Sequence, residues 1–342
     1  MGIFIDPSYG VFDSDRLFDL TNPILNRDDQ LLPFHRLREY FKVKGILVKT
    51  ADFIFKDTDA TMTISQPNYV SLGSLERFDH VSLEGRARLS AFVFMEPPVV
   101  LPSLYEALPK ISKAFDRVYL PNTSGDGYSL KDVDTSKLNL MYWPIPYNHV
   151  LEPYWGNTQR MKRIVVINGS HNPLSKNREQ YSVRIKAMAE LSKIDIVDLY
   201  GQGWDKWWSR RTMWMPYWLN RRAIMAIYHG SCKSKFDVLQ NYDFCLCFEN
   251  MTMDGYITEK LFDCLYAGTI PLYLGAPNIL KYIPADVFVD CRKYSSWTEM
   301  WHDVSKMTKS QIGKMRIAGR HFLSSDGAKK FYDSMVNICE ID

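Results

Sequence analysis

The stretch YDFCLCFENMTMDGYITEKLFDCLYAGTIPLYLGAPNILKYIPADVFVD, residues 242–290, decides the fold. Its first seven residues are apolar and rich in aromatic rings apart from Asp243, which is typical of a strand that is covered on both faces. A polar loop follows, and then a helix is predicted from about Thr258 to Ala267, where Gly268 ends it. Residues 270–274 are a second apolar strand. The order strand, helix, strand predicts a βαβ unit, and such units bind ligands where their parallel strands end.

Four polar side chains are expected at that end of the unit: Asn250, Tyr256, Glu259 and Lys260. The last three are spaced so that they can share one side of the first helical turn. Thr258 is expected to cap this turn, and its exposed N–H groups together with Lys260 would favour a bound anion such as a phosphate. A Glu–Lys pair at a helix start more often only faces water. Its position after a buried strand and a loop with an asparagine favours a ligand site here.

The ordered motifs FEN, YITEK and AGTIPLYLG, at residues 248–250, 256–260 and 267–275, resemble the C-terminal half of the α1,3/α1,4-fucosyltransferases, glycosyltransferase family 10. The resemblance is strong over residues 163–290 and faint before them. It implies the GT-B fold, an α/β architecture of two Rossmann-like domains facing across a cleft. It also implies inverting transfer of fucose from GDP-fucose to a hydroxyl of an oligosaccharide or lipid-linked glycan, for instance in lipopolysaccharide synthesis.

Length and composition agree with a protein of two domains. The chain has 342 residues, of which 46% are hydrophobic and 24% charged, enough for two ordinary cores. We expect an acceptor-binding domain at residues 1–155 and a nucleotide-sugar-binding domain at 156–342, whose final helix could return to the first domain. The formal net charge of +3 is too small to indicate a nucleic-acid partner.

The remaining elements are predicted from short apolar runs and helical periodicity. Helices are expected at residues 31–41 and 179–193, strands at 46–48, 52–55, 88–94, 115–120, 163–167 and 194–199, and a linker at 147–158.

Fixed positive charge must neutralise the diphosphate as it leaves. In the family, a basic residue on the helix after the first strand of this domain contacts the donor diphosphate. The resemblance places Arg184 in that role, with Arg178 as the alternative. If Arg184 has no part in binding, we expect it to be a solvated charge on the outer face of an amphipathic helix. Lys260 is expected to assist. Glu249 and Glu259 are expected to orient the ribose, guanine or fucose.

Inversion requires a base on the face opposite the leaving group, and carboxylates do such work in other glycosyl chemistry. In the family this acid follows a buried strand of the N-terminal domain. Glu96, in the string FVFMEPP, matches that location and is the predicted catalytic base. The structural alternative is a surface acid in a turn.

Two other functions remain open. Asp57 and Asp59 form the D-x-D string of a metal-dependent GT-A glycosyltransferase, in which a divalent cation holds the diphosphate. The same string occurs at residues 13–15 and 132–134, so it discriminates poorly. We therefore expect no required cofactor and no metal site, although a divalent metal could stimulate activity. A carbohydrate-binding protein that has lost catalysis is the other alternative.

Residues 203–222, GWDKWWSRRTMWMPYWLNRR, mix tryptophans with cations. Trp207, Trp208, Arg210 and Arg211 could stack on acceptor sugars or contact a membrane interface. A partly buried aromatic flap with cation–π pairs is an equally good reading. Nucleic-acid binding is disfavoured because the positive charge is confined to one segment.

The expected location is the cytoplasm, with peripheral contact at the inner face of the membrane. The first twenty residues carry acids early and have no apolar stretch of a signal peptide. The six cysteines show neither CxxC pairs nor metal-ligand spacing, which favours a reducing compartment.

Overall fold

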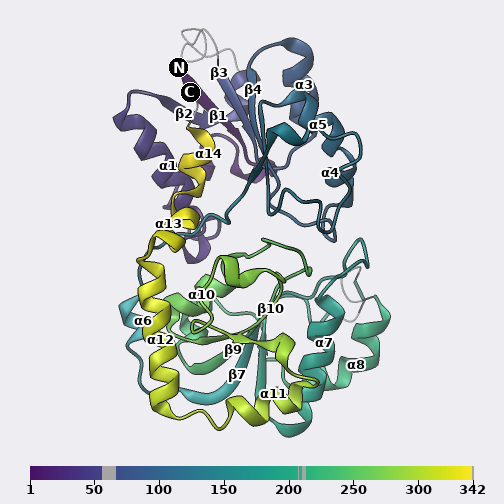
Figure 1. Cartoon of the computed structure of the whole chain (residues 1–342), viewed down its shortest axis with the longest axis vertical. Coiled ribbons are helices and arrows are strands. Elements are labelled where there is room, and N and C mark those ends of the chain that lie inside the picture. The colour runs from purple at the N-terminus through teal and green to yellow at the C-terminus, as the bar shows by residue number, and fades with distance from the viewer. Residues whose placement is uncertain (56–66, 207, 210–212, 341–342) are drawn as a thin grey trace. The chain divides into compact units, whose positions relative to one another are not determined.

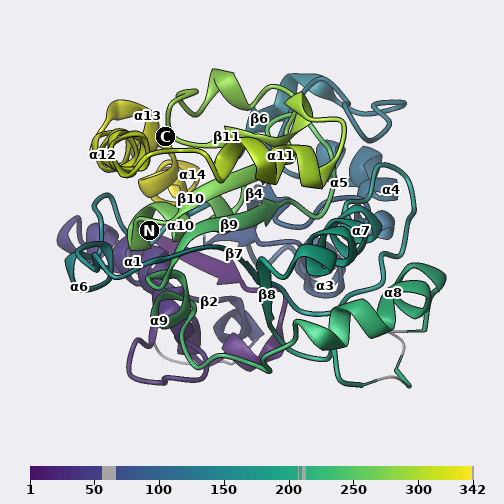
Figure 2. The ribbon, with the colours of Figure 1, turned by 90° about the horizontal axis from the view of Figure 1, so that it is seen from below.

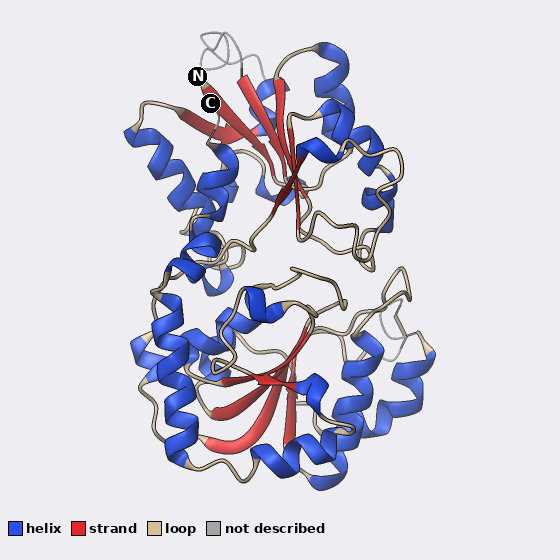
Figure 3. Ribbon diagram, viewed as in Figure 1, coloured by secondary structure: helices blue, strands red, loops and turns tan. Residues whose placement is uncertain are grey.

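The computed structural model describes residues 1–55, 67–206, 208–209 and 213–340. The chain forms two compact units (Figure 1). One comprises residues 1–146 together with 330–342, and the other comprises residues 147–329. In each unit helices flank a central parallel sheet, as the colouring by secondary structure shows (Figure 3).

The first unit contains a six-stranded sheet in the order β2-β1-β3-β4-β5-β6, and every pair of neighbouring strands is parallel. Its strands are β1 (Gly2–Asp6), β2 (Leu47–Thr50), β3 (Pro67–Ser71), β4 (Arg88–Val93), β5 (Arg117–Leu120) and β6 (Leu138–Leu140). Its helices are α1 (Leu32–Val43), α3 (Glu76–Glu84), α4 (Pro102–Glu106), α5 (Leu108–Ala114) and α14 (Ser334–Cys339), and α13 (Asp326–Tyr332) leads into α14.

Alternating side chains of the central strands build a core on each face of this sheet. Ile3 and Ile5 of β1 join one apolar cluster, whereas Phe4 between them joins the other. Helix α14 contributes Met335 and Ile338 to the first cluster. Burial on both faces explains why residues 3–5 of β1 are all apolar.

The second unit contains a five-stranded sheet in the order β11-β10-β9-β7-β8, again with parallel neighbours. Its strands are β7 (Met161–Ile167), β8 (Val197–Tyr200), β9 (Tyr242–Phe248), β10 (Ile270–Leu274) and β11 (Val289–Asp290). Its helices are α6 (Glu152–Trp155), α7 (Tyr181–Leu191), α8 (Met215–Ala226), α9 (Lys235–Leu239), α10 (Glu259–Ala267), α11 (Trp297–Val304) and α12 (Lys309–Leu323).

Both sheets share one topological feature. The second strand in the chain lies on one side of the first, and the third lies on the other, so the winding direction reverses between β1 and β3 and again between β7 and β9. Open α/β sheets bind ligands beyond the carboxyl ends of their strands at such a reversal. We call this side of each sheet its carboxyl edge.

The predicted βαβ unit is confirmed at residues 242–248, 259–267 and 270–274, with Gly268 in the left-handed conformation that ends the helix. The strand expected at residues 52–55 is wrong. Residues Ala51–Phe55 form a 3-10 helix, because the Asp52 carboxylate accepts hydrogen bonds from the Thr50 hydroxyl and the Ser14 amide and folds the chain back. Strands β1 and β3 and helix α8 were not predicted.

Candidate functional site

The carboxyl edge of the second sheet is closed by two loops that pair with each other. The Gln180 N–H donates to the Asn250 carbonyl at 2.9 Å, and the Thr252 N–H donates to the Arg178 carbonyl at 2.9 Å. An antiparallel bridge between Glu179 and Met251 lies between them. The loop after β9 and the residues before α7 are thus held together at the reversal between β7 and β9.

The loop after β7 is fixed from the other side by β8. A Cβ on Gly201 would lie 2.0 Å from the carbonyl oxygen of Asn168, so no other residue fits there without movement of the backbone. The Trp204 indole N–H donates to that same oxygen at 2.6 Å. Three strand ends therefore meet at one rigid edge.

Glu249 is the centre of this edge. Its side chain is 0% exposed, and it accepts hydrogen bonds from the Thr258 N–H and the Thr258 hydroxyl, both at 2.8 Å. The Lys260 ammonium lies 3.3 Å from the same carboxylate. Burial raises the pKa of Glu249, while Lys260 and Thr258 act in the opposite direction. The carboxylate joins the end of β9 to the start of α10, so it acts as a positioning residue.

Lys260 lies among three oxygen acceptors. Besides Glu249, its ammonium contacts the Thr258 hydroxyl at 3.0 Å and the Glu259 carboxylate at 3.5 Å. Burial opposes its charge, but Glu259 and Glu249 raise its pKa, so it is a fixed cation. Burial likewise opposes the charge of Glu259, but Lys260 and Lys235 outweigh it and lower the pKa of Glu259.

Two details of the predicted helix start are wrong. Thr258 occupies the N-cap position, but its hydroxyl donates to Glu249 and makes no capping hydrogen bond to the helix. Tyr256 precedes the helix in a turn, where its N–H donates to the Met253 carbonyl at 3.2 Å, and its side chain is buried. It therefore does not share a helical face with Glu259 and Lys260.

Arg184 lies in the first turn of α7 and is buried. Its guanidinium donates to the carbonyls of Phe248 and Glu249, at 2.6 and 3.1 Å. Among the described residues its Nε has no hydrogen-bond partner, and burial lowers its pKa. Arg184 is thus hydrogen-bonded to the backbone at the end of β9.

Two further candidates lie beside it. Arg178 is half-buried, has a left-handed φ of 61°, and is part of the pairing between the two loops. Asn250 is half-buried, and no hydrogen bond within the described part of the chain occupies its side-chain amide. The pairing of the two loops brings Arg178 and Asn250 close together, and the spacing of these residues in the sequence does not reveal this.

Gly275 is required by this packing. It follows β10, and a Cβ there would lie 2.5 Å from both Glu249 Cγ and the Tyr273 hydroxyl. The Tyr273 hydroxyl in turn accepts a hydrogen bond from the Ala276 N–H at 3.0 Å. The glycine of the LGAP string therefore has a packing role beside Glu249.

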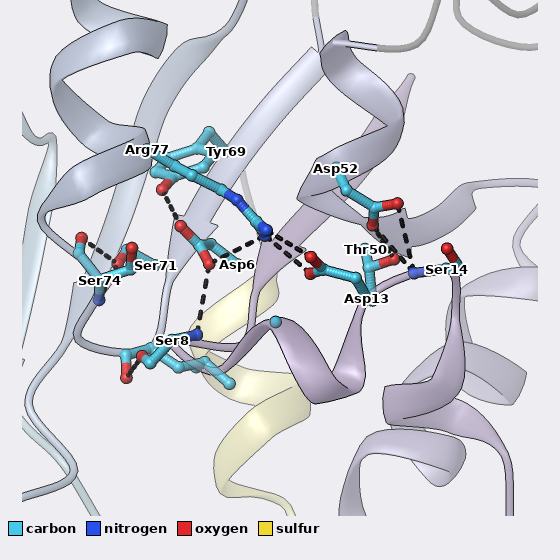
Figure 4. A network of polar contacts seen from close by, with 12 residues as sticks. Asp6, Ser8, Asp13, Ser14, Thr50, Asp52, Tyr69, Ser71, Ser74 and Arg77 are labelled. Carbon is cyan, nitrogen blue, oxygen red and sulfur yellow. Dashed lines mark hydrogen bonds and ion pairs between the residues drawn. The ribbon is translucent and has the colours of Figure 1, made fainter.

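The carboxyl edge of the first sheet carries a polar network that the sequence did not predict (Figure 4). Arg77 of α3 lies between Asp6, which ends β1, and Asp13, contacting the former at 3.4 Å and the latter at 2.8 Å. Hydrogen bonds to Asp13 raise the pKa of Arg77 against the effect of burial. Tyr69 of β3 also donates to Asp6, at 2.6 Å. The network occupies the reversal between β1 and β3.

Glu96 lies two residues after Phe94, beyond the end of β4, and is half-buried. Its backbone carbonyl accepts a hydrogen bond from the Tyr105 hydroxyl at 3.0 Å. Burial, and then the Glu96 carboxylate, raise the pKa of Tyr9 in the loop after β1. Glu96 thus lies at the carboxyl edge of the first sheet, in the electrostatic range of Tyr9.

The metal-binding alternative finds no support in the described residues. They contain no group of three His, Cys, Asp or Glu side chains that could hold a metal ion. Asp13 pairs with Arg77, and Asp15 pairs with Lys49 at 3.4 Å. Asp57 and Asp59 lie outside the described residues.

Of the tryptophan–arginine segment, Trp207, Arg210 and Arg211 lie outside the described residues, whereas Trp208 is exposed. No helix in the described ranges has the length and apolar character needed to cross a bilayer.

Comparison with known proteins supports a glycosyltransferase assignment for the second unit. Residues 162–316 match the model of the glycosyltransferase family 10 (fucosyltransferase) C-terminal domain. An α-(1,3)-fucosyltransferase of Helicobacter pylori is 39% identical over 104 residues, which are 30% of this chain and 22% of that protein. A bovine 4-galactosyl-N-acetylglucosaminide 3-α-L-fucosyltransferase is 32% identical over 129 residues, 37% of this chain and 30% of that protein. The matches thus span less than a third of these relatives.

Solved structures agree in fold. A glycosyltransferase from Rickettsia africae has a TM-score of 0.55 at 9% identity, over 98% of this chain and 95% of that one. The Anabaena protein HepE with UDP-glucose has a TM-score of 0.54 at 11% identity, over 99% and 97%. These likenesses confirm the predicted GT-B class, with two parallel α/β domains. Residues 162–316 therefore carry the C-terminal domain of glycosyltransferase family 10, as the motifs at residues 248–275 predicted.

Proposed function

We propose that the protein is an inverting fucosyltransferase that transfers fucose from GDP-fucose to a glycan hydroxyl. The observation that carries the proposal is the buried contact of Glu249 with Thr258 and Lys260 at the carboxyl edge of the second sheet. It lies within the family match and fixes a cation at the N-terminus of α10.

Binding of the donor is proposed at the N-terminus of α10, where the ammonium of Lys260 is fixed by its contacts. Lys260 and the N–H groups of α10 would face the diphosphate of GDP-fucose, because a helix start with an adjacent cation favours anions. Arg178 and Asn250 would complete this side from the paired loops. Nη2 of Arg184 donates hydrogen bonds to the carbonyls of Phe248 and Glu249, so we propose that Arg184 orders the loop after β9. Its Nε, which has no hydrogen-bond partner among the described residues, is then the atom that would contact the donor.

The acceptor half rests on the carboxyl edge of the first sheet. The acceptor hydroxyl would attack C1 of fucose as the bond from C1 to the phosphate oxygen breaks, and the bonding electrons would leave with GDP. The hydroxyl proton would pass to Glu96, since a carboxylate at the end of β4 can accept it. A single displacement of this kind inverts the configuration at C1.

No divalent cation enters this scheme as a required cofactor. Glu249 and Glu259 offset the charge of Lys260. We therefore propose that Arg178 and the helix start share with Lys260 the stabilisation of the leaving diphosphate. The kind of acceptor is open between two classes. The bovine relative is named for a 4-galactosyl-N-acetylglucosaminide acceptor, whereas a zebrafish relative, 30% identical over 155 residues, is named a GDP-fucose protein O-fucosyltransferase. We favour an oligosaccharide or lipid-linked glycan.

A donor screen tests the proposal. Purified protein is incubated with GDP-fucose, GDP-mannose and a set of UDP-sugars, and release of the nucleotide diphosphate is measured with and without mixed glycan acceptors. We expect turnover of GDP-fucose above all other donors. Preferential turnover of a UDP-sugar would refute the assignment. Glycan binding without GDP binding, measured by isothermal titration, would favour a carbohydrate-binding protein.

A further inference from the structure

Helix α8 turns an apolar face toward solvent. It is held to the second unit by Tyr217 and Ile224, which are fully buried and seven residues apart. The exposed positions on its opposite side are Met215, Trp218, Leu219 and Arg222. Their spacing of three, four and seven residues places them on one stripe. A surface helix ordinarily buries its apolar stripe in the core, so this face is built for contact with something else.

The loop before the helix extends the same surface. Trp208 and Met213 are exposed there, so five large apolar side chains are exposed between residues 208 and 219. No other stretch of that length in the described part of the chain exposes as many. Such a concentration marks an interaction site, because single exposed apolar residues are normal but contiguous ones are rare.

The charge of the surrounding sequence identifies the partner. Residues 206–222 contain five Lys and Arg and no Asp or Glu, so the rest of the chain, with 37 basic and 39 acidic residues, has a net charge of −2. The basic excess of the sequence therefore falls in the segment that leads into α8 and in α8 itself. Exposed Met, Trp and Leu beside arginines is the composition of a helix that lies in the interface of an anionic bilayer.

The surface adjoins the candidate donor site. Helix α8 lies alongside α7 in both views of the ribbon (Figures 1 and 2). The segment that leads to α8 starts at the carboxyl edge, where Trp204 is bonded to the loop after β7. A partner on α8 would thus sit beside the edge that carries Glu249 and Lys260.

We propose that the face formed by Met213, Met215, Trp218, Leu219 and Arg222 docks the protein on an anionic lipid bilayer. The apolar side chains enter the boundary between headgroups and acyl chains, and Arg222 contacts anionic headgroups. The inference does not depend on which sugar is transferred. Its consequence is that the donor-binding edge of the second unit is held close to a lipid surface, where a lipid-linked acceptor would be presented.

Nucleic acid and a sugar acceptor fit this face less well. A nucleic-acid site offers cations along a groove with aromatic rings for bases, whereas three of the five apolar side chains exposed here are aliphatic, among them Leu219 at 75% and Met215 at 66%. Sugars stack on flat rings, which Trp208 and Trp218 offer, but Met213, Met215 and Leu219, which make up the rest of the surface, do not. Nucleic-acid binding remains an outcome of the test.

Vesicle co-sedimentation of the full chain provides the test. Neutral phosphatidylcholine vesicles are compared with vesicles that contain about one third phosphatidylglycerol. We expect binding to the anionic vesicles only. Met215→Gln/Leu219→Gln should weaken the partition coefficient on the order of tenfold or more, since two apolar side chains leave the interface. Arg222→Gln should weaken it about fivefold, the effect of one cation near the surface.

Matched controls lie on the first unit. Val43 and Ile24 are 89% and 83% exposed, and Val43→Gln/Ile24→Gln removes as much exposed apolar surface elsewhere. Lys42→Gln removes one exposed cation. Both controls should bind like the unaltered protein, and circular dichroism with GDP-induced thermal protection checks that every variant is folded.

Three results would overturn the proposal. The first is absence of binding to anionic vesicles by the unaltered protein. The second is equal loss in the control variants. The third is binding that persists in Met215→Gln/Leu219→Gln yet disappears in high salt, because that pattern belongs to a surface for polyanions such as nucleic acid.

Discussion

Replacing Glu249 by glutamine should destabilise the second unit far more than the same change at its neighbour Glu259. The glutamine keeps an acceptor for the Thr258 N–H, but its amide N–H₂ then faces the Lys260 ammonium, which is only 17% exposed. Breaking a buried ion pair costs about 3–5 kcal/mol. Because Lys260 retains Glu259 at 3.5 Å, we expect a loss of roughly 2–4 kcal/mol. For a unit of this size that is a fall in Tm of roughly 4–16 °C.

Glu259→Gln is the matched control. This carboxylate contacts the same lysine, but its side chain is 36% exposed, and such pairs contribute about 0–1 kcal/mol. The two variants should also differ in pH dependence. Burial raises the pKa of Glu249 above the ordinary 4.5. The contribution of Glu249 to the free energy of unfolding therefore decreases as the pH rises from 4.5 through the raised pKa. The pKa of Glu259 is lowered, so its contribution is full above 4.5 and is lost as the pH falls.

Differential scanning calorimetry from pH 4 to pH 8, with and without GDP, measures both effects. The Tm difference between the unaltered protein and Glu249→Gln should shrink as the pH rises, and that for Glu259→Gln should shrink as it falls. GDP protection should decrease in Glu249→Gln, because the helix start is no longer fixed. Equal and small losses for the two variants would refute the role of Glu249 as the positioning residue of the site.

Three further predictions concern catalysis, packing and metal. Glu96→Gln should lower transfer on the order of a hundredfold or more while GDP affinity is unchanged, and a near-normal rate would move the base to Glu106 or Asp116, tested in the same assay. Gly275→Ala should cost about 1–3 kcal/mol, since its Cβ would clash with Glu249 and Tyr273. Gly313→Ala on α12, where a Cβ meets nothing within 4 Å, should leave Tm unchanged or raised, and equal Tm values for the two would contradict the packing. Activity should survive EDTA at least in part, whereas complete loss restored only by Mn²⁺ or Mg²⁺ would favour the metal-dependent alternative.

The central elements of the second unit were predictable because several signals agree there. Strand β9 is apolar apart from Asp243, α10 ends at a glycine, and β10 begins two residues after that glycine. Strand β3 is different, because it starts with Pro67 and Asn68 and is short, so neither its composition nor its pattern indicates a strand. Helix α8 was missed because its exposed side is the apolar one, which reverses the usual pattern of a surface helix.

The candidate site was predicted as a set of residues but not as an arrangement. The sequence indicated Glu249, Lys260 and Arg184, and all three lie at one edge of the sheet. Spacing did not reveal that Glu249 is buried beneath Thr258, because that contact joins a strand end to a helix start nine residues later. Neither did it reveal the network of Asp6, Asp13 and Arg77, whose members come together only when β1 and β3 pair.

Hydrogen–deuterium exchange of the full chain with GDP or UDP tests the central claim most directly. We expect GDP to slow exchange at residues 168–184 and 249–260, which form the paired loops and the start of α10. UDP at the same concentration should leave those amides unchanged. Protection that is confined to residues 1–146, or that is equal with UDP, would contradict the assignment of a GDP-sugar site to the carboxyl edge of the second sheet.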